Sequence, residues 1–279
     1  MKILVTGGAG YIGSHTCVEL LNNGYEVVVM DNLYNASEKA VERVQQITGK
    51  TLKFYNADML DQPAMDQIFE AEKPDAVIHC AAWTAVDAAE EDENKYKVKG
   101  INFGGTKNIA RVCNELDIPM MYISTDYVFD GQGEAPWTPD CTDYKPLNVY
   151  GETKLQGERA VANNTDKFFI VRIAWVFGMN GNNFIKTMLK VGKNHSELRV
   201  VNDQIGTPTY TYDLARLLVD MIQTDKYGYY HATNEGGYIS WYDFTKEIFR
   251  QAVEQGHEEY SEDKVTVTPV TTEEYGVSK

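Results

Sequence analysis

A tyrosine and a lysine four residues apart, Tyr150 and Lys154, have the types and spacing needed for acid–base chemistry. Residues four apart on an α-helix lie on the same face, so the two side chains should point the same way. A nearby ammonium favours a phenolate, so we expect Lys154 to lower the pKa of Tyr150 and make it a proton donor near neutral pH. Because many solvated helix faces carry the same spacing, the elements around the pair must supply the context.

A glycine-rich segment near the N-terminus supplies part of it. The β-rich run 2–6 leads directly into Gly7-Gly8-Ala9-Gly10-Tyr11-Ile12-Gly13, and a helical pattern follows from Ser14 to Asn23. Gly7 allows a tight turn, Gly10 lets the backbone approach a pyrophosphate, and Gly13 lets the helix lie close to the strand. This order predicts a dinucleotide site. The alternative is a turn that merely joins a strand to a helix.

An acidic residue ends the second predicted strand. The run 26–30 is followed by Asp31, about 20 residues beyond the glycines, where a carboxylate can accept hydrogen bonds from an adenosine ribose. A 2′-phosphate would be repelled there, although Lys39 and Arg43 could offset this. The cofactor is therefore expected to be NAD(H) or NADP(H), with NAD(H) favoured by Asp31.

Strands and helices continue to alternate through the first half of the chain. Strands are expected at 52–56, 75–80, 120–124 and 168–174, with helices opening at Gln62-Pro63 and covering 101–116. The pattern predicts an α/β fold, a doubly wound parallel (Rossmann) sheet with a smaller substrate-binding lobe. Residues 1–176 should form the dinucleotide-binding domain and 177–279 the lobe, with parts near 198–227 returning to the first domain. Ligands in such folds bind at the carboxyl ends of the strands.

Composition excludes several other classes of protein. The net charge of −15 argues against a nucleic-acid partner. No run of residues is apolar enough to span a bilayer, so the chain is expected to be cytoplasmic, without a membrane partner and with reduced cysteines. No histidine or cysteine spacing suggests a metal site, and a monomer or a homodimer is expected.

The words T-G-x-x-G-x-x-G at 6–13 and Y-x-x-x-K at 150–154 resemble those of the extended short-chain dehydrogenase/reductase superfamily, and the resemblance covers nearly the whole chain. Up to about Ala82, GGAGYIGSHTCVELL is similar to the UDP-glucose 4-epimerase family. From about Thr84, STDYVFDG, PLNVYGETKLQGE and RIAWVFG resemble the dTDP-4-dehydrorhamnose reductase family. In that family the pattern continues past TTEEYGVSK, so one side of the lobe is expected to be uncovered.

The resemblance also implies roles for residues. Thr125, Tyr150 and Lys154 would be catalytic, and Thr125, Asp126 and Trp175 would contact a dTDP-sugar. Arg172 and Arg199 are candidates for its diphosphate, with a surface salt bridge as the alternative for each. The cofactor is expected to contact the glycine motif, the ends of the following strands and the catalytic pair: Gly7, Gly10, Tyr11, Ile12, Gly13, Asp31, Asp58, Met59, Ala81, Ala82, Trp83, Thr84, Tyr150 and Lys154.

Three functions follow as hypotheses. The first is reduction of the C4 ketone of dTDP-4-dehydro-6-deoxy-L-mannose to dTDP-L-rhamnose by an NAD(P)-dependent oxidoreductase. The second is a UDP-sugar 4-epimerase, and the third is a non-catalytic nucleotide-sensing subunit. Substrate consumption, net cofactor change and the effect of replacing Tyr150 separate the three.

Overall fold

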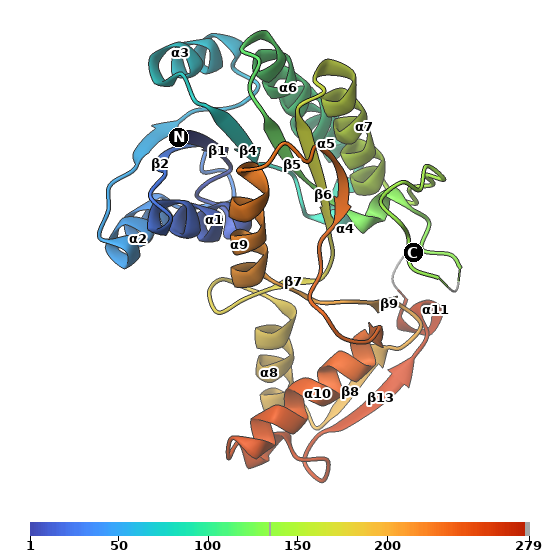
Figure 1. Cartoon of the computed structure of the whole chain (residues 1–279). Helices are drawn as coiled ribbons and strands as arrows, with labels where there is room; N and C mark the ends of the chain where they lie inside the picture. The colour runs from blue at the N-terminus through green and yellow to red at the C-terminus, as the bar shows by residue number, and fades with distance from the viewer. Residues whose placement is uncertain (134, 277–279) are drawn as a thin grey trace. The chain divides into compact units, whose positions relative to one another are not determined.

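A parallel sheet flanked by helices forms the first of two structural units, which confirms the predicted fold class. The computed structural model describes residues 1–133 and 135–276, and within them seven strands lie in the order β11-β6-β5-β4-β1-β2-β3 (Figure 1). Every neighbouring pair is parallel. The strands are β1 (Lys2–Thr6), β2 (Glu26–Asp31), β3 (Lys53–Asn56), β4 (Ala76–His79), β5 (Met120–Thr125), β6 (Phe168–Ile173) and β11 (Gly228–His231).

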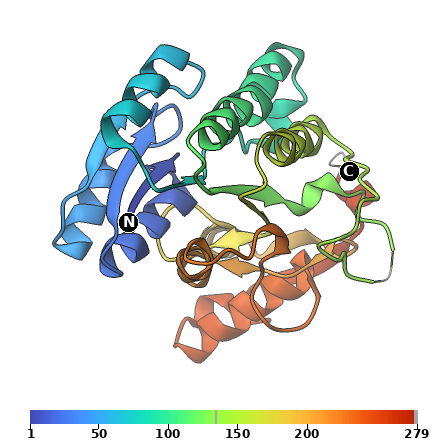
Figure 2. The same ribbon diagram turned by 45° about the horizontal axis from the view of Figure 1, so that its top comes forward.

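The central strands are apolar on both faces, because helices cover both. Every residue of β4 and β5 is buried. Helices α1, α2 and α9 lie on one side of the sheet, and α6 and α7 pack side by side on the other (Figures 1 and 2). The helices are α1 (Tyr11–Asn22), α2 (Glu38–Thr48), α3 (Gln62–Glu72), α4 (Val86–Ala89), α5 (Asp92–Lys99), α6 (Thr106–Glu115), α7 (Val149–Asn164) and α9 (Thr211–Ile222).

Two helices differ from their predicted extent. Helix α1 begins at Tyr11 rather than Ser14, because Gly10 occupies its N-cap position inside the glycine motif. The helix predicted over 101–116 is interrupted at its start: Gly100–Gly105 forms a π-helical turn (η1), and the α-helix resumes at Thr106. Such turns are rare and often occur at functional sites.

The second unit has its own core, formed around two long helices and one pair of strands. Strand β8 (Glu197–Val201) pairs in parallel with β13 (Thr266–Val270). Leu198 of β8 is buried together with Phe244 and Phe249 of helix α10 (Trp241–Glu254). Side chains of helix α8 (Phe184–Asn194) pack against this cluster. Ser240 caps α10 through a capping box. Short elements complete the unit: β7 (Val176–Phe177), β9 (Ile205–Gly206), β10 (Thr209–Tyr210), β12 (Ile239–Ser240) and α11 (Thr272–Tyr275).

The chain divides into two compact units. The first unit comprises Met1–Ile173 and Thr211–Ala232, and the second comprises 174–210 and 233 onwards. Parts near 198–227 were expected to return to the first domain; of this range, helix α9 belongs to the first unit, together with strand β11, and 198–210 belongs to the second. The last three residues of TTEEYGVSK, 277–279, lie outside the described residues. No helix in the described part of the chain is both long and apolar enough to cross a membrane.

Candidate active site

The glycine motif forms a tight loop between β1 and α1 that leaves no room for side chains at Gly7 and Gly13. Gly7 has φ +68°, and a Cβ there would lie 2.5 Å from the backbone nitrogen of Ala81. A Cβ on Gly13 would lie 2.2 Å from the carbonyl oxygen of Gly7. Gly10 is the N-cap of α1 and supplies no capping side chain, and the first turn contains no acidic residue. The start of α1 is therefore suited to a pyrophosphate, which backbone N–H groups would hold.

Asp31 supports this loop from the end of β2. Its carboxylate accepts hydrogen bonds from the backbone nitrogens of Ala9, at 3.1 Å, and Leu33, at 2.9 Å. Burial raises the pKa of Asp31, and the two backbone hydrogen bonds oppose that shift. One role of Asp31 is thus to fix the glycine loop, a structural function that its position in the sequence did not reveal.

Two further cofactor candidates lie at the end of β3. The carboxylate of Asp58 accepts hydrogen bonds from the backbone of Leu60, at 2.8 Å, and from the side chain of Asn32, at 2.9 Å. Met59 is buried against Gly105, where a Cβ would come within 2.6 Å of the methionine side chain. Asp58 therefore connects the ends of β2 and β3, and Met59 packs on η1.

The segment after β4 is fixed by a buried asparagine. Asn102, in η1, accepts a hydrogen bond from the backbone nitrogen of Trp83 at 2.8 Å, and its amide donates to the carbonyl of Trp83 and the hydroxyl of Thr153. The Trp83 ring is buried and stacks on Tyr34, with 6.2 Å between ring centroids. Thr84, the next residue, is exposed. Asn102 thus joins the predicted cofactor strand end to helix α7.

Tyr150 lies in the first turn of α7 beside the end of β5. The side chain of Asn148 caps this helix through the backbone nitrogen of Gly151, at 2.8 Å, and so sets where it begins. Burial raises the pKa of the Tyr150 phenol, and a side-chain hydrogen bond with Thr125 partly offsets this. The expectation that Lys154 lowers the pKa of Tyr150 is wrong in this structure, because desolvation outweighs any effect of the ammonium.

Lys154 is buried against strand β5. Its Nζ donates to the carbonyl oxygen of Ile123 at 2.7 Å and lies 4.1 Å from the centre of the Tyr122 ring. Burial lowers the pKa of Lys154 to about 7, and the nearby Glu158 carboxylate and Cys80 thiol oppose the shift. Burial therefore favours the neutral form of this lysine far more than water does.

The substrate candidates are distributed between the two units. Asp126 lies next to Thr125, whose hydroxyl donates to its carboxylate at 3.0 Å, and burial raises the pKa of Asp126. Trp175 and Arg199 belong to the second unit: the Trp175 ring stacks on Trp241 at 3.6 Å between centroids, and Arg199 donates to the carbonyl of Glu274 at 2.9 Å. Arg172 is buried in an ion pair with Glu158, so it is not available to a diphosphate in this arrangement.

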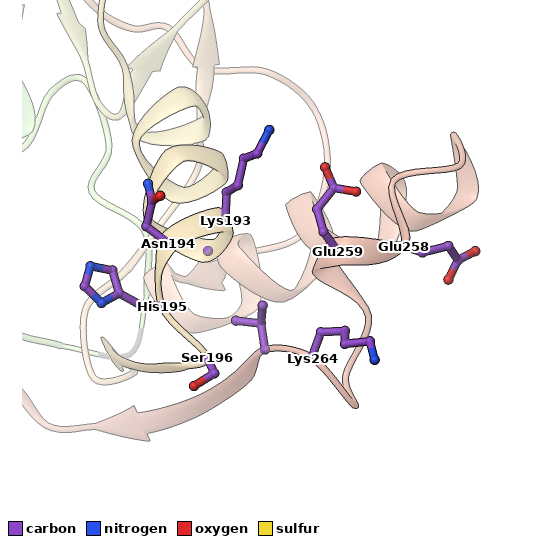
Figure 3. A pocket seen from close by; sticks show the side chains of 9 residues that line it. Lys193, Asn194, His195, Ser196, Glu258, Glu259 and Lys264 are labelled. Carbon is purple, nitrogen blue, oxygen red and sulfur yellow. The ribbon is translucent and has the colours of Figure 1, made fainter.

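A cavity of about 540 Å³ lies elsewhere, beside the end of α8 in the second unit. Its lining includes Lys193, His195, Glu258 and Lys264, but Figure 3 shows these side chains pointing in different directions rather than converging. None of the predicted site residues lines it. Among the described residues, no group of three or more histidine, cysteine or acidic side chains is arranged to hold a metal ion.

Some residues around the site were missed in the sequence. Glu158 and Asn102 are both buried. Glu158 accepts hydrogen bonds from Ser124 and the substrate candidate Arg172, and Asn102 accepts one from the cofactor candidate Trp83, yet neither stands out by type. Glu158 has one signal, because it lies four residues beyond Lys154 and so shares its helix face. Asn102 has none beyond its glycine-rich surroundings.

The glycine loop, the parallel sheet and the helix with Tyr150 and Lys154 together are typical of dinucleotide-dependent enzymes. Comparison with known proteins gives the family of this chain. The family model described as the RmlD substrate binding domain matches residues 1–278. The chain belongs to this family.

Three relatives show the range of similarity. The chain is 36% identical to dTDP-4-dehydrorhamnose reductase of Aggregatibacter actinomycetemcomitans over 283 residues, which cover 98% of this chain and 86% of the relative. A crystal structure of dTDP-4-dehydrorhamnose reductase from Bacillus anthracis in complex with NADP is 34% identical, with a TM-score of 0.80, and the match covers 99% of this chain and 86% of that one. UDP-glucose 4-epimerase of Bacillus subtilis is 46% identical over 162 residues, covering 57% of this chain and 46% of the epimerase.

Proposed function

We propose that this chain is a nicotinamide-dependent reductase that converts dTDP-4-dehydro-6-deoxy-L-mannose to dTDP-L-rhamnose by reducing the C4 ketone. The observation that carries the proposal is that Thr125, at the carboxyl end of β5, interacts with the side chain of Tyr150 on α7, in the same unit as the glycine loop. Membership of the family and the names of its relatives support a dTDP-sugar as the substrate.

The residues present divide the chemistry among them. A bound nicotinamide cofactor supplies the hydride. Because burial keeps the Tyr150 phenol protonated at neutral pH, it can give its proton to the C4 oxygen as negative charge builds there. An alkoxide is far more basic than a phenolate, so the raised pKa of Tyr150 does not prevent this transfer. Thr125 holds the same oxygen, and Lys154 can donate to a ribose hydroxyl of the cofactor.

The proposal is tested by mixing the purified protein with NADH or NADPH and the dTDP-keto sugar. Reduced cofactor should disappear in step with the formation of dTDP-L-rhamnose, followed by absorbance and by chromatography of the sugar nucleotides. A folded protein that binds the cofactor but leaves the keto sugar unchanged contradicts the proposal.

A UDP-sugar 4-epimerase is the second candidate, and the observation that favours it is the 46% identity with the Bacillus subtilis epimerase over part of the chain. An epimerase returns the hydride to the same molecule. UDP-galactose would then be converted to UDP-glucose with no net change in the cofactor, so the same two measurements separate the candidates.

For the cofactor, we propose that NADH is preferred to NADPH. The support is the position of Asp31 at the end of β2, where its negative charge would repel a 2′-phosphate. The relative from Bacillus anthracis was crystallised with NADP, so the preference needs its own test. Asp31→Asn should lower the ratio of kcat/KM for NADH to that for NADPH by about tenfold, since one removed like-charge contact contributes roughly 1 kcal/mol or more. An unchanged ratio would contradict the preference.

A further inference from the structure

Helix α7 is attached to strand β5 through three of its residues, each one helical turn from the next. The Tyr150 side chain interacts with that of Thr125, Lys154 donates to the carbonyl of Ile123 at 2.7 Å, and Glu158 accepts from the hydroxyl of Ser124 at 2.5 Å. The strand residues involved, 123–125, are consecutive. A shift of the helix along the strand would therefore break all three contacts together.

Glu158 is the most firmly held of the three helix residues. Its side chain is 1% exposed and receives two hydrogen bonds from the Arg172 guanidinium, from Nε at 2.9 Å and from Nη2 at 2.8 Å, besides the one from Ser124. Arg172 is itself completely buried on β6. Glu158 therefore joins α7 to two adjacent strands of the sheet.

Arg172 depends on this carboxylate. Its other side-chain partner is the Tyr144 hydroxyl, which accepts from Nη2 at 2.9 Å. Within the described residues, Nη1 has no hydrogen-bond partner. The rings of Phe129, Tyr144 and Tyr229 enclose the guanidinium at 5.0–5.2 Å. A neutral residue in place of Glu158 would leave a cation buried among aromatic rings without a counter-ion.

Glu158 also supplies negative charge near Lys154. The groups that act on the ammonium of Lys154 come from three elements: Glu158 on α7, the Tyr122 ring on β5, and Cys80 and His79 at the end of β4. His79 is uncharged at neutral pH, because burial lowers its pKa to about 3, and burial raises the pKa of the Cys80 thiol to about 12. Glu158 is thus the carboxylate in this set.

We propose that Glu158 is a positioning residue of the active site, which fixes the register of α7 on β5 and holds a negative charge beside the ammonium of Lys154. The proposal rests on the proposed reductase function for its kinetic consequence alone. The contacts with Ser124 and Arg172 are properties of the fold.

The test compares Glu158→Gln, the double variant Glu158→Gln/Arg172→Gln, and Glu152→Gln as the matched control. Glu152 lies on the same helix, is partly exposed and accepts a hydrogen bond from Gln156. Replacing Glu158 should lower kcat by on the order of 10²-fold, with a smaller change in KM, because Tyr150 and Lys154 would be displaced from their positions on β5. The control should keep kcat within about twofold, as expected for a surface change.

The second measurement does not require activity. The ¹³Cε resonance of Lys154, assigned by its loss in Lys154→Met, is followed as the pH is raised. Its titration midpoint should fall by about 1 pH unit in Glu158→Gln, since an opposite charge within a few ångströms contributes a shift of that order. The control should titrate like the wild type. A wild-type protein that titrates as expected but reduces no keto sugar would disprove the proposed function and leave the present inference intact.

The double variant separates positioning from simple structural support. Glu158→Gln should lower the stability of the protein, because Arg172 then has no counter-ion, and removing both charges should restore that stability. The kcat and the titration midpoint of Lys154 should stay low in the double variant. If the double variant recovers wild-type kcat and midpoint, Glu158 serves only to neutralise Arg172 and the proposal is overturned. An unchanged Lys154 midpoint in both variants also overturns it.

Discussion

Burial favours the neutral form of both Tyr150 and Lys154. The phenol resists losing its proton, and the ammonium gives one up more readily than in water. A site of this kind keeps a proton available on Tyr150 over a wide pH range. The positive charge of Lys154, in contrast, depends on what lies nearby, so a negatively charged ligand would favour its charged form.

Replacing Tyr150 by Phe removes the proposed proton donor and leaves the ring in place. We expect kcat to fall by about 10²–10⁴-fold, the usual contribution of a general acid, with cofactor affinity nearly unchanged. Steady-state kinetics and a cofactor titration check this. Tyr96→Phe is the matched control, because Tyr96 is 91% exposed on α5. Equal turnover by the two variants would point instead to a non-catalytic sensor.

Replacing Lys154 by Met tests the charge of the buried lysine through protein stability, without an activity measurement. Burial lowers the pKa of Lys154 to about 7 in the folded protein, whereas the unfolded chain should have the ordinary lysine value of 10.5. Between these two pH values the unfolded chain therefore binds more protons than the folded protein. The free energy of unfolding contributed by Lys154 should therefore rise with pH in this window, by up to ~1.4 kcal/mol per pH unit. Urea titrations of both proteins at several pH values measure the difference. A constant difference from about pH 7 to pH 9 would contradict the shift.

At the level of residues, local patterns predicted the tight turn at Gly7 and the helix that carries Tyr150 and Lys154, because both depend on local geometry. Arg172 illustrates the limit. Its type suggested a phosphate ligand, but its partner Glu158 is 14 residues away on another element. Whether a charged side chain meets a ligand or another side chain depends on tertiary packing, which a single sequence does not show.

At the level of elements, the long regular segments were predictable and the short ones were not. Strand β1 matches its predicted range, and β2, β4, β5 and β6 each differ from theirs by one or two residues. The two-residue strands β7, β9, β10 and β12 have no periodicity to detect. The pairing of β8 with β13 joins segments about 70 residues apart, so it depends on the packing of α8 and α10 rather than on any local pattern.

Gly13 tests the contact between the glycine loop and α1. Gly13→Ala would place a Cβ 2.2 Å from the carbonyl oxygen of Gly7 and 2.7 Å from the Cα of Gly8, both backbone atoms. We expect a loss of about 1–3 kcal/mol of stability, as for overpacking, together with a large loss of cofactor affinity. Gly100→Ala is the control, because the nearest atom to its Cβ would be a leucine methyl carbon at 3.7 Å. Thermal melts and cofactor titrations measure both effects, and equal behaviour of the two variants would argue against a tight loop.

At the level of the whole molecule, the two units have separate hydrophobic cores. One surrounds the central sheet and includes Leu4, Val77 and Ile170, and the other surrounds β8 and includes Phe244 and Phe249. All the cofactor candidates belong to the first unit, whereas Trp175 and Arg199 belong to the second. The proposed binding of cofactor and of sugar nucleotide should therefore protect backbone amides in different segments of the chain.

Hydrogen exchange of backbone amides can measure the protection of each segment separately. NADH alone should slow exchange in the loop between β1 and α1 and after β2 and β4, because ligand contacts there oppose local opening. Strands β8 and β13 should exchange at their ligand-free rates, since their core contains no cofactor candidate. Adding dTDP to the NADH complex should then slow exchange near Trp175 and Arg199. Protection of β8 and β13 by NADH alone would contradict this division.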